Sequence, residues 1–191
     1  MQADQKKWDE KYKGRELRAG GSPNPFLKRF IRLLPRGIAL DVACGEGRNA
    51  VFLARKGFQV EALDISAIAL QKARKLARDF KVKIRTLQGD LDFYPLEKEK
   101  YDLIADFYFL DRRLIPKLKR GLKKGGRIIF ETYLADPGGA DPGAPQNPRY
   151  LLKPNELLHR FREFRVLFYR EGIFREGGRK KAIASLIAEK L

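Results

Sequence analysis

Residues 38–57, IALDVACGEGRNAVFLARKG, constrain the fold of this chain more than any other stretch. An apolar run that carries one carboxylate, Asp41, leads into a turn with glycines at 45 and 47, and residues of helical character follow. Glycine lets the backbone turn sharply and lets a ligand approach the main chain, while a helix start presents unpaired N–H groups. The pattern predicts a strand, a tight loop and a helix that cradle a small ligand, although such glycine turns also occur without one.

The same alternation of strand and helix continues along the chain. Further strands are expected at 58–63, 82–87, 101–105 and 127–134, with helices at 66–80, capped by Ser66, and at 111–124, capped by Asp111 and ended by Gly125 and Gly126. This order predicts an α/β fold in which helices cover both faces of a parallel sheet. Strands at 166–170 and 181–189, joined by a turn at 177–178, predict an added antiparallel hairpin whose second strand is an inner one.

The remaining segments flank this core. Residues 1–34 are expected to form an N-terminal helical cap, with Trp8 and Tyr12 on one face of a polar helix over 4–13 and Asn24 capping a second helix that begins at Pro25. Residues 135–150 are rich in proline and glycine, and we expect a loop there that lies over the site. At 191 residues the chain is expected to form one domain, residues 1–191, because it is short for two.

Composition excludes several kinds of site. One cysteine, Cys44, and one histidine, His159, cannot build a disulfide framework or a structural zinc site, so no metal is expected. No apolar run is long enough for a bilayer, and the first 20 residues lack the apolar middle of a secretory signal, so a cytoplasmic protein without a membrane partner is expected.

The net charge of +17 raises the question of an RNA partner. The 41 Lys and Arg residues are spread along the chain with many of the 24 Asp and Glu residues between them. This distribution favours a solvated basic surface, as in heat-adapted proteins, over a nucleic-acid site.

Four acids stand where predicted strands end: Asp41, Asp64, Asp90 and Asp106. Ligands of open parallel sheets bind beyond the carboxyl ends of the strands. Asp64 lies about 20 residues after the glycine loop, where a carboxylate can bind both hydroxyls of a ribose; the alternative is an acid that caps the helix after Ser66. Negative charge from Asp41 and Glu46 would repel a pyrophosphate, which favours S-adenosylmethionine over a nicotinamide dinucleotide.

The chain resembles the class I S-adenosylmethionine-dependent methyltransferases, and is most similar to the bacterial subgroup named for tellurite-resistance methyltransferases. The resemblance covers nearly the whole chain and is carried by ALDVACGEGRNAVFLARKGFQVEALDIS, QGDLDFYPL, YDLIADFYFLDRRLIPKLKRGLKKGGRIIFETY and NPRYLLKPNELL. It implies a Rossmann-like three-layer α/β sandwich with a seven-stranded, mostly parallel sheet and a C-terminal antiparallel hairpin, the last strand lying between the fifth and sixth.

The resemblance also implies a site for S-adenosylmethionine and its product S-adenosylhomocysteine. By position, the first part of the motif would hold the methionyl end, the second and third strands the ribose and adenine, and the fourth strand the methyl group. The implied cofactor-binding residues are Asp41, Ala43, Gly45, Gly47, Asn49, Asp64, Ile65, Asp90, Leu91, Asp106 and Phe107.

Methyl transfer from a sulfonium needs alignment and exclusion of water but no nucleophilic side chain, so neither Cys44 nor His159 is expected to take part. The candidate catalytic residues are Tyr108, Arg175 and Arg179, and Tyr133, Tyr150 and Trp8 can wall an apolar space.

The acceptor is expected to be a small molecule with a soft nucleophile, a thiol or a chalcogen oxyanion, as the name of the subgroup suggests. After the fourth strand the chain lacks both an Asn/Asp-Pro-Pro-Tyr motif and a Pro-Cys pair, which argues against methylation of nucleic-acid amino groups and of pyrimidine carbon. The alternatives are an RNA methyltransferase, a non-catalytic S-adenosylmethionine-binding protein and a nicotinamide oxidoreductase. A monomer or a homodimer is expected.

Overall fold

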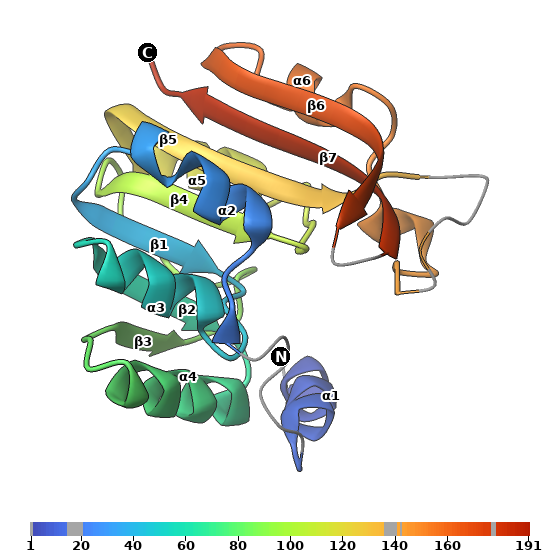
Figure 1. Cartoon of the computed structure of the whole chain (residues 1–191). Helices are drawn as coiled ribbons and strands as arrows, with labels where there is room; N and C mark the ends of the chain where they lie inside the picture. The colour runs from blue at the N-terminus through green and yellow to red at the C-terminus, as the bar shows by residue number, and fades with distance from the viewer. Residues whose placement is uncertain (1, 15–20, 136–140, 142, 177–178) are drawn as a thin grey trace.

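Seven strands form one twisted sheet at the centre of the computed structural model, which describes residues 2–14, 21–135, 141, 143–176 and 179–191 (Figure 1). The sheet order is β3-β2-β1-β4-β5-β7-β6. The strands are β1 (Ile38–Val42), β2 (Gln59–Asp64), β3 (Arg85–Gln88), β4 (Tyr101–Phe107), β5 (Leu122–Tyr133), β6 (Arg165–Glu176) and β7 (Arg179–Glu189). Strands β1 to β5 pair in parallel, and β7 runs antiparallel to β5 and β6. The predicted mostly parallel sheet, with β7 inserted between the fifth and sixth strands, is confirmed.

Helices cover both faces of the sheet. They are α1 (Gln2–Tyr12), α2 (Pro25–Phe30), α3 (Arg48–Arg55), α4 (Ala67–Asp79), α5 (Ile115–Gly121) and α6 (Glu156–Arg160), with 3-10 turns η2 (Ile31–Leu33) and η3 (Pro148–Tyr150). Alternate residues of β1 point to opposite layers: Ala39 packs with α2 and α3, whereas Leu40 packs with α5 and α6. These two apolar cores, one on each face, make the three-layer sandwich that was expected (Figure 1).

Two of the three helix caps predicted from the sequence are present, those of Asn24 and Ser66. The Asn24 side chain accepts hydrogen bonds from the N–H groups of Phe26 and Leu27, and the Ser66 hydroxyl accepts one from the N–H of Ala69. Both caps satisfy N–H groups that a helix start leaves unpaired. They fix where α2 and α4 begin, and therefore where the chain turns at the carboxyl ends of the strands.

Asp111 does not cap α5, contrary to the prediction. The helix starts later, with Leu114 as its N-cap residue and Pro116 as its second residue, where the missing N–H is harmless. The Asp111 carboxylate instead accepts the N–H of Arg113 at 2.9 Å and pairs with its guanidinium at 2.9 Å.

The prediction that Gly125 and Gly126 end α5 is also wrong. The helix ends at Gly121, and Leu122 already pairs with Tyr101 before the register shifts at Leu103. A Cβ on Gly126 would lie 3.0 Å from the carbonyl oxygen of Tyr101, so a side chain there would press against β4. The two glycines thus belong to an irregular start of β5 and not to a helix terminus.

Three smaller differences concern strand ends and one side chain. Strand β3 is shorter than predicted, and β6 is longer. Phe80, expected inside, is 40% exposed because α4 ends before it and Lys81 takes a left-handed φ of 54°; its ring contacts the Arg55 guanidinium at 4.8 Å. The predicted turn at 177–178 lies outside the described residues. So do residues 136–140 and 142 of the predicted loop at 135–150.

Candidate functional site

The glycine loop follows β1 in a left-handed backbone conformation. Ala43, Gly45 and Gly47 have φ values of 47°, 53° and 79°. A Cβ on Gly47 would lie 2.6 Å from the Cβ of Ala73 in α4, and one on Gly45 would lie 2.9 Å from the hydroxyl oxygen of Tyr12 in α1. The close approach of α4 therefore excludes a side chain at Gly47, whereas one at Gly45 would displace the Tyr12 hydroxyl; the sequence alone did not reveal either contact.

Asp64 ties this loop to the end of β2. One carboxylate oxygen accepts the N–H of Gly45 at 2.8 Å, and the other accepts the N–H of Ser66 at 2.9 Å. Burial raises the pKa of the Asp64 carboxyl, while these backbone hydrogen bonds act in the opposite direction. The N–H of Ile65 is a further partner of this carboxylate, and of its roughly four lone-pair sites at least one is left to accept a hydroxyl from a ligand.

Asp41 and Asp106 lie on the neighbouring strands β1 and β4, one residue out of register. Val42 pairs with Asp106 in the parallel register, and both carboxyl groups are 1% exposed. One oxygen of each, Oδ2 of Asp41 and Oδ1 of Asp106, has no hydrogen-bond partner among the described residues. Burial raises the pKa of Asp41 to about 7 and raises that of Asp106 well above its usual range, with the nearby Asp41 charge contributing to the second shift.

Two buried, unpartnered carboxylate oxygens are unfavourable unless a donor or a positive charge meets them. An ammonium supplies both and a sulfonium supplies the positive charge, whereas a pyrophosphate supplies neither. The acceptor oxygens at the ends of β1 and β4 therefore fit a cationic ligand.

The other predicted cofactor residues are placed as follows. Leu91 and Phe107 are buried, and Ile65 and Asp90 are half-buried after β2 and β3. The side-chain oxygen of Asn49 accepts the N–H of Asn24, at the start of α2 in the same helix layer, at 2.9 Å. The predicted set thus gathers at the carboxyl ends of β1 to β4, with Asn49 linking α3 to the start of α2.

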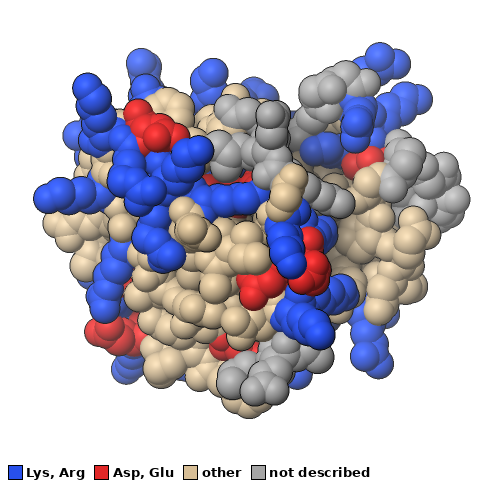
Figure 2. All heavy atoms as spheres, turned by 90° about the horizontal axis from the view of Figure 1, so that it is seen from below, with Lys and Arg blue, Asp and Glu red and all other residues tan. Residues whose placement is uncertain are grey.

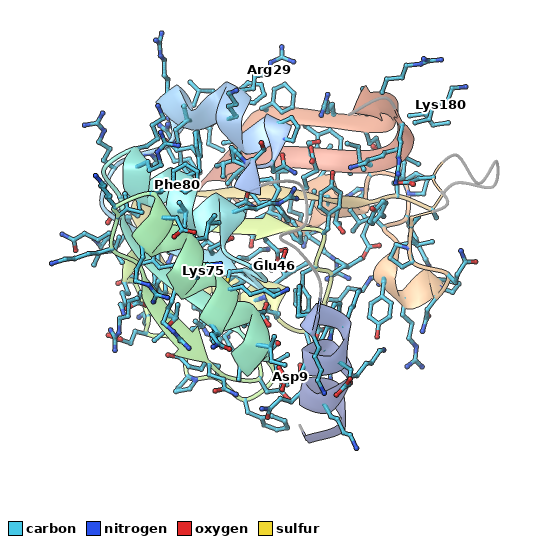
Figure 3. All side chains as sticks on the ribbon, turned by 60° about the horizontal axis from the view of Figure 1, so that its bottom comes forward. Asp9, Arg29, Glu46, Lys75, Phe80 and Lys180 are labelled. Carbon is cyan, nitrogen blue, oxygen red and sulfur yellow. The ribbon has the colours of Figure 1, made fainter. Side chains whose placement is uncertain are left out.

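Glu46 contributes less negative charge than the sequence suggested. Its carboxylate lies 3.0 Å from the ammonium of Lys72, and Figure 3 shows it next to α4. Because this pair is largely neutral, the preference for a cationic ligand rests on Asp41 and Asp106.

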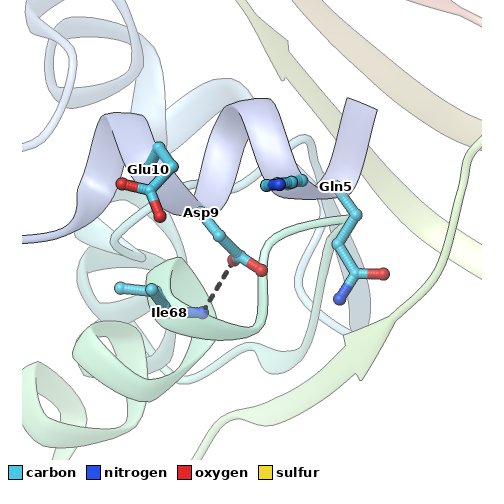
Figure 4. Close-up of a pocket in the computed structure, with 5 residues that line it drawn as sticks. Gln5, Asp9, Glu10 and Ile68 are labelled. Atoms are coloured by element: carbon cyan, nitrogen blue, oxygen red, sulfur yellow. Dashed lines mark hydrogen bonds between the residues drawn. The ribbon is translucent and has the colours of Figure 1, made fainter. Parts of the chain in front are cut away.

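Helix α1 lies against the start of α4 (Figure 1). The Asp9 carboxylate accepts the Ser66 hydroxyl at 2.6 Å. It also accepts the N–H of Ile68 at 3.2 Å, as Figure 4 shows. A shallow pocket of about 390 Å³ opens beside this contact, lined by Gln5, Lys6, Asp9, Glu10 and Ile68. No sequence pattern distinguishes Asp9, because it is one of several charged residues on a polar helix.

The candidate catalytic residues are separated in the structure. Tyr108 follows Phe107 directly, and its ring lies 5.0 Å from that of Tyr133. Arg175 and Arg179 are exposed near the turn of the hairpin, where Lys180 is the cross-strand neighbour of Arg175. Figure 3 shows Lys180 far from Glu46 of the glycine loop. Their assignment stays a prediction, but the distance from the glycine loop favours Tyr108.

Two residues beside Tyr108 were missed. The Tyr108 hydroxyl oxygen lies 3.2 Å from a carboxylate oxygen of Glu131 and 3.1 Å from the ammonium of Lys181. Glu131 is 0% exposed. A carboxylate directly after the apolar residues 128–130 of a predicted strand was the available signal for Glu131, whereas Lys181 is one of several cations near the hairpin turn.

Other chemistry has little support in the part of the chain that the structure describes. Among these residues no three His, Cys, Asp or Glu side chains come together as metal ligands, and no helix is long and apolar enough to cross a membrane. Burial and the charges of Asp41 and Asp64 raise the pKa of the Cys44 thiol, which keeps it protonated and a poor nucleophile. His159 is exposed.

Comparison with known proteins agrees with this geometry. Residues 39–126 match the family model described as a methyltransferase domain. The probable S-adenosyl-L-methionine-dependent methyltransferase TehB of Haemophilus influenzae is 25% identical over 138 residues, which cover 70% of this chain and 48% of TehB. The ubiquinone biosynthesis O-methyltransferase of Serratia proteamaculans is 27% identical over 158 residues, covering 71% of this chain and 66% of that protein. The chain thus spans less than two thirds of the length of these curated relatives.

Solved structures show the same fold. The crystal structure of TehB from Haemophilus influenzae superposes with a TM-score of 0.73 at 20% identity, covering 98% of this chain and 67% of that one. A second structure is described as the conversion of a disulfide bond into a thioacetal group during echinomycin biosynthesis. It superposes with a TM-score of 0.75 at 20% identity, covering 97% of this chain and 91% of that one. Residues 39–126 thus resemble a methyltransferase domain, and the fold of the chain is similar to that of TehB.

Proposed function

We propose that this protein is an S-adenosylmethionine-dependent methyltransferase that acts on a small molecule. The observation that carries the proposal is the pair of buried carboxylates, Asp41 and Asp106, each with one oxygen that lacks a partner among the described residues. They stand beside a glycine loop that Asp64 holds in place. A ligand with a nucleoside at one end and positive charge at the other fits this arrangement.

The residues of the site divide between the two ends of that ligand. We assign the ribose to Asp64, whose carboxylate keeps a spare lone pair, and the adenine to the apolar side chains of Ile65 and Leu91 beside Asp90. The methionyl ammonium and the sulfonium belong with the acids at 41 and 106. The backbone of the loop, with Ala43, Gly45, Gly47 and Asn49 around it and Phe107 at the end of β4, completes the wall.

When bound, S-adenosylmethionine supplies a methyl group on a positively charged sulfur. The protein's contribution is to align the acceptor with that methyl group and to keep water away. The buried acids compensate the positive charge of the cofactor in a site of low polarity, and the φ of 60° at Tyr108 turns the chain away from β4 immediately after the acid at 106. Tyr108 and Tyr133 then form a wall on the acceptor side.

We further propose a soft nucleophile, a thiol or a chalcogen oxyanion, as the acceptor. The support is the likeness to TehB and to a structure concerned with the conversion of a disulfide bond, together with the aromatic wall at Tyr108. The likeness to an O-methyltransferase of ubiquinone biosynthesis extends the class to acidic hydroxyls. A single domain, a cytoplasmic location and a monomer or homodimer remain predictions from the sequence.

Calorimetric titration with S-adenosylhomocysteine and with NAD tests the cofactor. We expect S-adenosylhomocysteine to bind and NAD to give no heat. Binding of NAD alone would contradict the proposal and favour an oxidoreductase. Binding of S-adenosylhomocysteine without methyl transfer to any thiol, hydroxyl or oxyanion would favour the non-catalytic binder.

A further inference from the structure

Glu131 is a fully buried carboxylate in β5 to which the proposed function gives no role. One of its oxygens accepts Nδ2 of Asn24 at 2.9 Å and the hydroxyl of Tyr108 at 3.2 Å. The other accepts the Ser185 hydroxyl at 2.7 Å and lies 3.5 Å from the guanidinium of Arg170. Four partners from four separate segments thus hold one carboxylate in a fixed orientation inside the protein.

Tyr108 connects this buried acid to the acceptor side of the site. It stands two positions after Asp106, in a left-handed conformation with a φ of 60° that bulky residues rarely adopt. Its N–H donates to the carbonyl oxygen of Glu131 at 2.8 Å, so β5 fixes both ends of the residue. Non-glycine residues held in this way concentrate at functional sites.

The Tyr108 oxygen lies between a carboxylate and an ammonium. The Lys181 Nζ donates to that oxygen at 3.1 Å and stands 4.7 Å from the ring centroid. The hydroxyl proton of Tyr108 can therefore point to Glu131, while negative charge that develops on the oxygen is stabilised by Lys181. This is the arrangement of a base that is oriented by one group and stabilised by another.

We propose that Tyr108 and Glu131 form a proton relay that deprotonates the acceptor during methyl transfer. The proposal rests on the proposed function, because it needs a methyl donor at Asp106. As the bond between the acceptor atom and the methyl carbon forms, the bond from that carbon to the sulfonium sulfur breaks. The acceptor proton passes to the Tyr108 oxygen and the Tyr108 proton passes to the Glu131 carboxylate, so that the products are the methylated acceptor, neutral S-adenosylhomocysteine sulfur and a protonated Glu131.

The relay defines the class of acceptor. A base assists only an acceptor that is protonated when it binds, such as an alkyl thiol, whose pKa is about 8.5 in the case of cysteine. An acceptor that is already an anion gains nothing from it. The geometry thus points to protonated thiols or hydroxyls and away from oxyanions as the substrates for which the site is built.

Two thiols of similar size test the relay. 2-Phenylethanethiol stays largely protonated near neutral pH, whereas thiophenol is largely ionised there. With the full-length protein and S-adenosylmethionine, we expect Tyr108→Phe to lower the single-turnover rate for 2-phenylethanethiol by about 100-fold, the usual contribution of a general base, and that for thiophenol by less than about threefold. Glu131→Gln should show the same preference for thiophenol.

Tyr169→Phe is the matched control. Tyr169 also donates its hydroxyl to a carboxylate, that of Glu171 at 2.5 Å, but it lies on β6 outside the site. We expect this variant to methylate both thiols at the wild-type rate. If Tyr108→Phe binds S-adenosylhomocysteine with the wild-type affinity, its cofactor site is intact. The comparison of the two thiols can then be made with Tyr108→Phe even if Glu131→Gln does not fold.

Each contrary result is distinct. An equal loss on both thiols, or no loss on either, overturns the relay and leaves the proposed function standing. Methylation of neither thiol by a wild-type protein that binds S-adenosylhomocysteine overturns the acceptor class. Failure of the wild-type protein to bind S-adenosylhomocysteine overturns the proposed function itself.

Discussion

Asp64 joins two roles at one carboxylate: it holds the N–H groups of Gly45 and Ser66, and it is the group we assign to the ribose. We expect Asp64→Ala to weaken S-adenosylhomocysteine binding at least about tenfold, which corresponds to the loss of about 1.4 kcal/mol of charge-assisted hydrogen bonding. Isothermal titration calorimetry measures this change directly.

Asp102→Ala is the matched control for that variant. Asp102 also accepts a backbone N–H, that of Ile38 at 2.8 Å, but at the amino end of the sheet. Both variants should lower the melting temperature, and only Asp64→Ala should change the dissociation constant. An unchanged constant in Asp64→Ala would show that the ribose is held elsewhere.

Asp41 makes both stability and cofactor binding depend on pH. Burial raises its pKa to about 7 in the folded protein, whereas an aspartate in the unfolded chain titrates near 3.9. Between these values the folded state holds more protons than the unfolded state, so this group stabilises the protein fully below about pH 4 and the stabilisation is lost as pH rises toward 7. Asp41→Asn should lack this contribution to the dependence of the free energy of unfolding on pH.

Binding of S-adenosylmethionine has the opposite dependence on pH. A cationic ligand prefers the ionised carboxylate, so the wild-type affinity should rise between pH 6 and 8, by up to about tenfold per pH unit below the pKa. Urea unfolding measures how the free energy of unfolding depends on pH, and calorimetry at the same pH values measures how the affinity for S-adenosylmethionine depends on it. The same slopes in Asp41→Asn as in the wild type would contradict the role of this carboxyl.

At the scale of the elements, the glycine loop depends on the approach of α4. Gly47 and Gly57 both have a left-handed φ, of 79° and 88°, but a Cβ on Gly47 would lie 2.6 Å from the Cβ of Ala73, whereas one on Gly57 would meet nothing within 4 Å. Substitution by Ala therefore adds the same backbone strain at both sites and a steric clash at only one.

We expect Gly47→Ala to be more destabilising than Gly57→Ala by at least about 1 kcal/mol, the lower end of the effect of overpacking. It should also weaken S-adenosylhomocysteine binding, because α4 and the loop must separate. Thermal unfolding and calorimetry compare the two variants. Equal destabilisation would mean that α4 adjusts to the extra methyl group without disturbing the loop.

Local signals were sufficient for most of the elements. Asn24 and Ser66 are caps that act within three residues of themselves, and the apolar run in β7 reports burial on both sides wherever the strand lies. The start of β5 could not be predicted in the same way. Gly125 and Gly126 have the appearance of a helix terminus, and only the proximity of the Tyr101 carbonyl shows why glycine is needed there.

Some contacts of the candidate site could likewise be predicted from local patterns, and others could not. Acids at strand ends could be predicted to meet, because the carboxyl ends of parallel strands share one edge of a sheet. The contacts of Glu131 with Asn24, Tyr108 and Ser185 span 107, 23 and 54 residues, and no local pattern encodes such pairs. The docking of Asp9 on α4, across 57 residues, is hidden for the same reason.

At the scale of the whole molecule, the net charge of +17 invites the RNA alternative. Many of the cations are engaged locally: Arg113 pairs with Asp92 and Asp111, and Arg127 pairs with Glu189. On the face seen in Figure 2, Lys and Arg side chains occupy several areas, with Asp and Glu among them and uncharged surface between. The charge is therefore distributed over this face and not concentrated into one track for a phosphate backbone.

We accordingly expect binding of RNA to be weak and steeply dependent on salt. Fluorescence anisotropy with a labelled 20-nucleotide oligouridylate should show association at low ionic strength and none at about 0.15 M salt, where charges more than about 8 Å apart are largely screened. Addition of S-adenosylhomocysteine should leave the titration unchanged, because a diffuse attraction does not involve the cofactor site. Affinity that persists at this salt concentration and responds to S-adenosylhomocysteine would favour an RNA methyltransferase over an enzyme that acts on small molecules.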